Sequence, residues 1–152
     1  MVKSRTVLTT GAFDILHLGH MLMLKDAKKL AGPRGKLVVV VASDKTVRRN
    51  KGRAPIFGAR ERKKMLQFLK PVDEVLIGYD PVSFEKILRK VRPDIVAFGY
   101  DQRKIRDQFL RFCRERKVKV RVVTLRKHNV NPVSSSDVVK RVLSLGKRVR
   151  RL

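Results

Sequence analysis

Cysteine is almost absent from this chain of 152 residues, in which Cys113 is the only one. A lone thiol forms no internal disulfide, so we expect the protein to be cytoplasmic. Because Cys113 follows apolar residues at helical spacing, we expect it to pack in the core rather than to react. Long apolar runs are also missing, since none approaches the roughly 20 residues that cross a bilayer. The N-terminus carries no signal-peptide pattern either, and the sequence therefore predicts no membrane partner.

Acidic residues are scarce, with 13 Asp and Glu against 38 Lys and Arg and a formal net charge of +25. A field of this strength attracts polyanions. Two interpretations follow: a surface that neutralises nucleic-acid phosphates, or an enzyme of phosphate-rich small molecules whose surface is generally basic. Tryptophan is absent and tyrosine occurs twice. Few rings are therefore available for stacking bases, which counts against a nucleic-acid-binding module.

Apolar residues recur along the whole chain at 43% of the sequence, enough to bury one core in a single domain. Short apolar runs predict strands at residues 7–10, 36–42, 74–77, 94–98 and 118–125. Helical patterns alternate with them at residues 18–30, 59–69, 83–91, 103–116 and 134–145. This alternation predicts an α/β fold, a parallel five-stranded sheet with helices on both faces.

Two basic stretches lie outside these elements. Residues 43–57 read as a polar connection whose length indicates a functional or mobile loop. Residues 146–152 read as a basic C-terminal tail, so we expect the domain itself to span residues 1–145.

The junction between the first strand and the first helix has the composition of a phosphate site. The strand leads into Thr10, Gly11, Ala12 and Phe13. The helix then opens with His17-Leu18-Gly19-His20. Ligands of doubly wound sheets bind at the carboxyl ends of strands, and a helix N-terminus there presents free N–H groups to an anion. Two histidines three residues apart share a helix face and can donate hydrogen bonds to phosphoryl oxygens.

Two plainer interpretations of these histidines compete with this one. Exposed capping histidines would occur without any ligand, and a structural zinc site would need a third ligand that the neighbouring sequence does not offer. Two histidines, Gly11 and Gly19 coincide at one strand–helix junction. Because glycine lets backbone approach a ligand closely, we favour phosphate handling.

Residues 9–20, TTGAFDILHLGH, resemble the signature of the cytidylyltransferase-like nucleotidyltransferases, with its HxGH motif. The family includes glycerol-3-phosphate cytidylyltransferase, phosphopantetheine adenylyltransferase and archaeal FAD synthase. The resemblance extends over nearly the whole chain and implies a Rossmann-like, doubly wound fold. It also implies transfer of a nucleotidyl group from a nucleoside triphosphate to a phosphate monoester, with release of pyrophosphate and use of Mg²⁺ or another divalent cation.

Further segments resemble the family in the same order. Lys51 lies where a phosphate-contacting lysine is expected, with a solvated loop charge as the alternative. Arg62 aligns with an arginine that contacts the acceptor phosphate or the triphosphate, with an exposed helix arginine as the alternative. Asp101, in the turn Gly99-Tyr100-Asp101-Gln102, is expected to orient nucleotide or metal, or else to cap a helix.

The last helix is preceded by a serine-rich segment that resembles the family's Ile-Ser-(Ser/Thr)-(Ser/Thr) motif. Hydroxyls and N–H groups there can hold phosphates at a helix N-terminus, and three successive serines exceed what a cap requires. These are Ser134, Ser135 and Ser136. Residues 126–132 depart from the family pattern, which leaves the role of Arg126 open.

The resemblance implies a choice of substrates. The Gly-Tyr-Asp-Gln turn is most similar to archaeal FAD synthase, so we expect adenylyl transfer from ATP to FMN. A CTP-using cytidylyltransferase of glycerol 3-phosphate or a similar alcohol phosphate is the alternative. A non-catalytic nucleic-acid-binding module is an alternative of another class, supported by the charge of +25. The family also implies a homodimer.

Overall fold

The computed structural model describes residues 4–149. Its centre is one sheet of parallel strands in the order β3-β2-β1-β4-β5. The strands are β1 (Thr6–Gly11), β2 (Lys36–Val41), β3 (Glu74–Ile77), β4 (Ile95–Phe98) and β5 (Arg121–Thr124). The chain starts in the middle of the sheet and moves outward first to one side and then to the other. This confirms the predicted Rossmann-like, doubly wound α/β fold.

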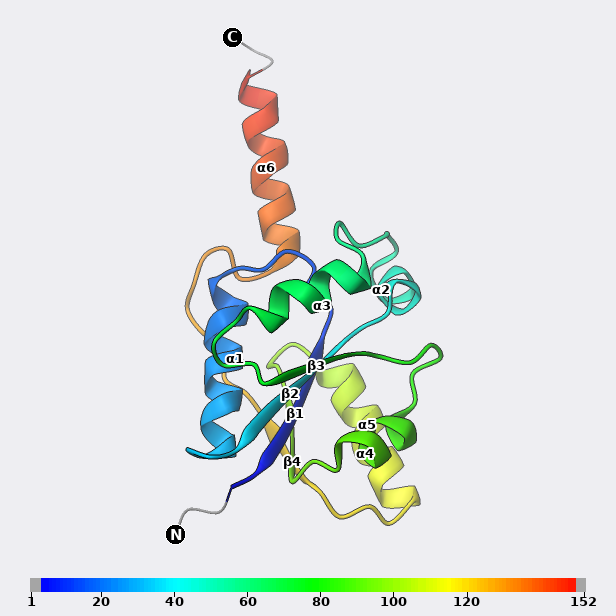
Figure 1. Cartoon of the computed structure of the whole chain (residues 1–152). Helices are drawn as coiled ribbons and strands as arrows, with labels where there is room; N and C mark the ends of the chain where they lie inside the picture. Colours follow the sequence, from blue (N-terminus) through cyan, green and yellow to red (C-terminus); the bar gives the residue numbers. More distant parts are fainter. Residues whose placement is uncertain (1–3, 150–152) are drawn as a thin grey trace.

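Helices cover both faces of the sheet (Figure 1). Helices α1 (Leu18–Ala31) and α3 (Ala59–Gln67) lie close against one face. Helices α4 (Phe84–Val91) and α5 (Arg103–Glu115) cover the other face and approach the strands less closely. Because parallel strands are buried on both faces, their side chains are apolar in every register position rather than in alternate ones.

Each face of the sheet has its own apolar cluster. Leu24 and Leu66, from α1 and α3, pack with strand residues such as Val39 on one side. Phe84 and Phe109, from α4 and α5, pack with Val40 and its neighbours on the other. Cys113 belongs to this second cluster and is buried, which confirms its predicted place in the core.

The stretch expected to be a connection contains a helix, α2 (Asp44–Lys51). The Ser43 hydroxyl caps it by accepting a hydrogen bond from the Thr46 backbone N–H (3.1 Å). Gly52 ends it in the left-handed conformation at φ 67°. The run of basic residues hid this helix, because its only buried residues are Thr46 and Val47 and no apolar stripe appears in the sequence. The described residues therefore form six helices where five were expected.

The last helix, α6 (Ser135–Val149), projects from the body of the molecule (Figure 1). It continues through Gly146, four residues beyond its expected end, so part of the predicted basic tail is helical. The remainder of that tail, residues 150–152, lies outside the described residues. No helix within residues 4–149 is long and apolar enough to cross a membrane.

Candidate active site

The two motif histidines lie side by side where β1 leads into α1. His17 is the N-cap of α1, and its Nδ1 accepts a hydrogen bond from the Gly19 backbone N–H (3.1 Å). This bond leaves the proton of a neutral ring on Nε2, which is buried without a partner among the described residues. The His20 ring lies 3.9 Å from that of His17, centroid to centroid, and its Nδ1 is likewise buried and unpartnered. Buried polar atoms without a protein partner are typical of a ligand-binding site.

Both imidazoles are neutral near pH 7. Burial lowers the pKa of His20 to about 3, and the proximity of His17 and Lys51 adds to the effect. Burial also lowers the pKa of His17, although Asp137 and Asp101 partly oppose it. The pKa of Lys51 is lowered as well, by burial and by Arg53. His17 and His20 therefore offer neutral hydrogen-bond donors rather than fixed positive charges.

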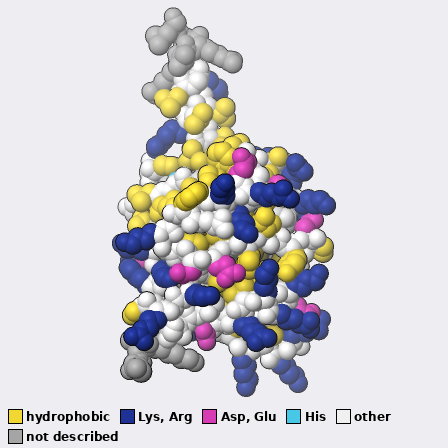
Figure 2. Space-filling model, in the orientation of Figure 1, with side chains coloured by type: hydrophobic (Ala, Val, Ile, Leu, Met, Phe, Trp, Pro, Cys, Tyr) yellow, Lys and Arg dark blue, Asp and Glu magenta, His cyan; other side chains and the backbone are white. Residues whose placement is uncertain are grey.

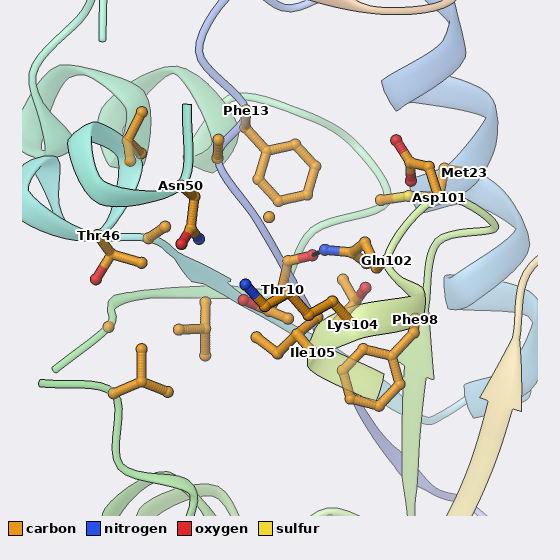
Figure 3. Close-up of a pocket in the computed structure, with 18 of the residues that line it drawn as sticks. Thr10, Phe13, Met23, Thr46, Asn50, Phe98, Asp101, Gln102, Lys104 and Ile105 are labelled. Atoms are coloured by element: carbon orange, nitrogen blue, oxygen red, sulfur yellow. Dashed lines mark hydrogen bonds between the residues drawn. The ribbon is translucent and has the colours of Figure 1, made fainter. Parts of the chain in front are cut away.

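A cavity of about 960 Å³ opens beside these histidines, at the carboxyl ends of the strands. It lies where the sheet order reverses between β1 and β4, the expected ligand position in this fold. The structure places most of the predicted site residues on its wall: Thr10, Gly11, Ala12, Phe13, His17, Gly19, His20, Lys51, Asp101, Ser134 and Ser135. Figure 3 shows Thr46 and Asn50 of α2 on one side of the space and Lys104 and Ile105 of α5 across from them.

Arg62 and Ser136 do not reach this wall. The Arg62 side chain is fully buried and lies away from the cavity wall, where the sequence led us to expect a substrate-contacting arginine. Its guanidinium donates to the Phe57 carbonyl (2.8 Å) and the Ala12 carbonyl (2.6 Å), and pairs with Asp44 (2.7 Å). Arg62 thus joins the β1–α1 turn to Phe57 and to the start of α2. Ser136 is exposed on α6.

Asp14 completes this junction. Its buried carboxylate accepts hydrogen bonds from the backbone N–H groups of Ile56 (3.0 Å) and Phe57 (2.9 Å). Burial acts to raise the pKa of Asp14, but these N–H donors and Arg53 outweigh it and lower the pKa. The carboxylate is therefore ionised, and the segment that follows Lys51 is fixed against the β1–α1 turn.

The start of α6 is bound to the same turn. The Ser135 hydroxyl donates to the Ile15 carbonyl (3.2 Å) and accepts from the Ile15 N–H (3.3 Å). The Ser134 hydroxyl donates to the Asp137 carboxylate (2.9 Å) and accepts from the Asp137 N–H (3.2 Å). Ser134 is thus a helix cap as well as a cavity residue. Two helix N-termini, those of α1 and α6, meet at the cavity, which favours an anion there.

Gln102 links the ends of two neighbouring strands at the site. The Gln102 amide donates to the Thr10 carbonyl (2.7 Å), and its oxygen accepts from the Gly99 N–H (2.7 Å), as Figure 3 shows in part. The ends of β1 and β4 are joined in this way. Asp101, the preceding residue, is exposed at the cavity.

A family model described as cytidylyltransferase-like matches residues 8–141. The chain belongs to this cytidylyltransferase-like family. Among curated relatives, it is 43% identical over 145 residues to the FAD synthase of Methanopyrus kandleri, covering 95% of both chains. It is 44% identical over 142 residues to the FAD synthase of Korarchaeum cryptofilum, covering 93% of both.

Solved structures resemble the fold as well. A lipopolysaccharide core biosynthesis protein from Thermoplasma volcanium is 38% identical, with a TM-score of 0.74 over 84% of this chain and all of the other. A protein from Archaeoglobus fulgidus whose function is unknown is 19% identical, with a TM-score of 0.63 over 80% of this chain and 89% of the other. This second likeness concerns the fold alone.

Some cavity residues of this family member were not expected from its sequence. In the segment between β5 and α6, His128 Nε2 lies 2.8 Å from the Asp26 carboxylate of α1, and Arg126 lies 3.3 Å from it. These contacts hold the segment beside the cavity, where Arg126, His128 and Val130 form part of the wall. As the third histidine in the chain, His128 was the one available signal. The apolar residues of α4 and α5 on the wall could not be told from ordinary core residues.

Acidic ligands for a metal are few at the cavity. Asp101 is the one carboxylate on the described wall, and residues 4–149 contain no group of three or more His, Cys, Asp or Glu side chains placed to hold a metal. Magnesium often binds through one or two carboxylates together with substrate phosphates and water. The residues present therefore fit a cation that arrives with a triphosphate rather than one held by the protein alone.

Proposed function

We propose that this chain is an FAD synthase, which transfers the adenylyl group of ATP to the phosphate of FMN and releases pyrophosphate. The observation that carries the proposal is the unpartnered His17 Nε2–H, buried beside His20 at the meeting point of two helix N-termini. The Gly99-Tyr100-Asp101-Gln102 turn and the FAD synthases among its relatives, at 38–44% identity, support FMN as the acceptor.

The reaction is an in-line substitution at the α-phosphorus. A phosphate oxygen of FMN forms the new P–O bond, the bond to the bridging oxygen between the α- and β-phosphates breaks, and pyrophosphate leaves with the electron pair. No covalent intermediate with the protein is needed. The protein positions the reactants and neutralises the charge that develops on the phosphoryl oxygens.

We assign the following roles to residues at and near the cavity. His17 and His20 donate hydrogen bonds to the triphosphate near the transferred group. Lys51 attracts the FMN phosphate and stabilises the transition state. The N-terminus of α6, with Ser134 and Ser135, holds the leaving pyrophosphate. Arg62 is a positioning residue, because it touches only the segments that carry the others.

Magnesium would enter as the complex with ATP. Asp101, the one carboxylate on the described wall, would be its protein ligand. When bound, the cation would neutralise phosphate charge and help pyrophosphate to leave. The protein groups described above would still orient both substrates.

We also propose that the protein is a homodimer in which α6 contacts a second copy. Val142, Leu143 and Leu145 are between 54% and 62% exposed on this helix, and Figure 2 shows apolar side chains along it and around its base. A single helix without packing partners is marginally stable in water, so its apolar face favours a partner. Val142→Asp with Leu143→Asp should yield a monomer in sedimentation velocity, and an unchanged dimer would contradict this contact.

The substrates are tested by a pyrophosphate-release screen that crosses ATP and CTP with FMN, glycerol 3-phosphate and phosphopantetheine. We expect release with ATP and FMN, together with FAD as the product. Release with CTP and glycerol 3-phosphate instead would show a cytidylyltransferase. No release with any pair would contradict the proposal.

A further inference from the structure

The cavity is much more apolar on one side of the sheet than its phosphate end requires. Part of its wall consists of residues that also belong to the apolar cluster under α4 and α5. We call this part the inner compartment, and its defining side chains are Val40, Phe84, Ile87, Phe98, Ile105 and Phe109. Protein interiors seldom leave space larger than a water molecule, so an apolar space that opens into a binding cavity indicates a ligand.

The inner compartment exists because the two helix layers pack differently. Val40 and Phe98, near the carboxyl ends of β2 and β4, point to the same face of the sheet. Helices α4 and α5 stand further from that face than α1 and α3 stand from the other. On the α1 and α3 side, the apolar strand residues of β1, β2 and β4 belong to a separate cluster and do not line the cavity. The apolar strand side chains on the wall therefore come from the face under α4 and α5.

The distribution of charge indicates which part of the cavity binds phosphate and which part binds an apolar group. A triphosphate placed among Phe98, Ile105 and Ile87 would lose its hydration without gaining partners, which is strongly unfavourable. Backbone N–H groups that can hold an anion lie instead at the starts of α1 and α6. The cationic side chains Arg49 and Lys104 also line the cavity. Lys51, the last residue of α2, also lines the cavity and is placed for the second phosphate. The inner compartment is thus left for an uncharged, largely apolar group that is joined to a phosphate.

The apolar side chains of the compartment favour a ring. Phe98 of β4 and Phe109 of α5 are in contact, with ring centroids 5.6 Å apart, so no gap separates the two layers there. The open part lies beside Ile87 and Ile105, which are only partly buried. In Figure 3, Ile105 lies across the open space from Thr46 and Asn50 of α2. The Asn50 side chain presents both an N–H donor and a carbonyl acceptor, which match the alternating acceptors and donor along an imide edge. Glycerol phosphate has neither a ring nor apolar area to cover these side chains.

We propose that the inner compartment binds the isoalloxazine ring of FMN, with Ile105 contacting the ring and Asn50 contacting its imide edge. The proposal rests on the FAD synthase function argued above and adds where the acceptor is recognised. It makes Ile105 and Asn50 residues that determine specificity for the flavin, while they have no part in binding the triphosphate.

Binding of FMN without ATP tests this placement apart from turnover. Flavin fluorescence and its polarisation report the ring, so the wild-type protein, Ile105→Trp and Leu110→Trp can each be titrated into FMN. Ile105→Trp fills the compartment and should weaken FMN binding about tenfold or more. The KM for ATP should change less than about twofold. Leu110 lies on the same helix, is 38% exposed and does not line the cavity, so Leu110→Trp is the matched control and should bind FMN normally.

A second variant guards against misfolding of the first. Asn50 is exposed on α2, and Asn50→Leu should weaken FMN binding while its thermal unfolding midpoint stays that of the wild type. Normal FMN affinity in both Ile105→Trp and Asn50→Leu would overturn the placement of the ring, even if the wild type makes FAD. Absence of both FMN binding and FAD formation in the wild type would overturn the proposed function together with this inference.

Discussion

At the scale of single residues, burial decides what the two motif histidines can do. A charged imidazole would attract a triphosphate. Burying that charge at this site would, however, cost desolvation energy. The structure keeps the His20 ring neutral, with a pKa of about 3. Neutral donors fixed by packing act by orientation rather than by net charge, which suits groups that stabilise a transition state more than a ground state.

This view predicts the cost of removing His20. His20→Ala should lower kcat by about 10² or more, because the loss of one positioned transition-state donor costs about that much. The rate of pyrophosphate release at saturating ATP and FMN measures it. The variant should still bind FMN with wild-type affinity, since His20 lies at the phosphate end of the cavity. Near-normal turnover in this variant would contradict the mechanism.

The same residue predicts how stability depends on pH. The pKa of His20 is about 3 in the folded protein and about 6.5 in an unfolded chain. The folded protein therefore binds fewer protons, and stability is retained above pH 6.5 and lost as the pH falls from about 6.5 to about 3. Between pH 7 and pH 5, the wild type should lose about 2 kcal/mol of unfolding free energy that His20→Gln does not lose.

Urea unfolding of both proteins at several pH values, without nucleotide, measures the difference. Other groups titrate equally in the two proteins, so their contributions cancel in the comparison. Parallel pH profiles for wild type and His20→Gln would show that burial does not lower the pKa of this imidazole.

At the scale of elements, the sequence predicted what depends on local pattern. Continuous apolar runs such as residues 36–42 identified buried parallel strands, because both faces of those strands require apolar side chains. The helix α2 was missed, since only Thr46 and Val47 face the interior and its caps lie within a basic run. Lys51 reaches the cavity wall and Arg62 does not. This difference depends on how α2 and α3 pack, which no local pattern records.

The inner compartment shows the same limit. Residues such as Phe98 and Ile105 have the spacing of ordinary core residues, and nothing local distinguishes a packed contact from a cavity wall. The distance between helix layers produces the space, and that distance results from the packing of the whole domain. The histidine motif could be found because its chemistry is carried by rare residue types next to one another in sequence.

Arg62 provides a prediction at this scale. Arg62→Lys keeps the charge but loses the planar fork that reaches Phe57, Ala12 and Asp44. We expect it to destabilise the protein by about 3 kcal/mol, as removal of buried charge-assisted contacts does. Lys51→Ala, at the cavity wall, is the contrast, and it should lower kcat with an unchanged thermal unfolding midpoint. If Arg62→Lys instead altered only the KM for a substrate, Arg62 would be a substrate-contacting residue after all.

At the scale of the whole molecule, the charge of +25 is unaccounted for by the cavity alone. Basic side chains are spread widely over the face of the molecule that Figure 2 shows. A surface of this kind binds polyanions by releasing their counter-ions, independently of their sequence. Such binding is compatible with an enzyme and does not require a dedicated nucleic-acid module.

Salt dependence separates the two interpretations. Binding of a labelled single-stranded RNA, measured by fluorescence anisotropy, should weaken about 10³-fold between 50 and 200 mM salt. FMN binding should change far less over the same range, because its ring is held by apolar contacts.

A chain that ends at residue 145 lacks four of the basic residues, so it should bind RNA more weakly, with a shallower salt dependence. It should keep wild-type turnover if the domain is complete at that point. Tight RNA binding that resists salt, in a protein that releases no pyrophosphate from any triphosphate, would instead identify a nucleic-acid-binding module built on this fold.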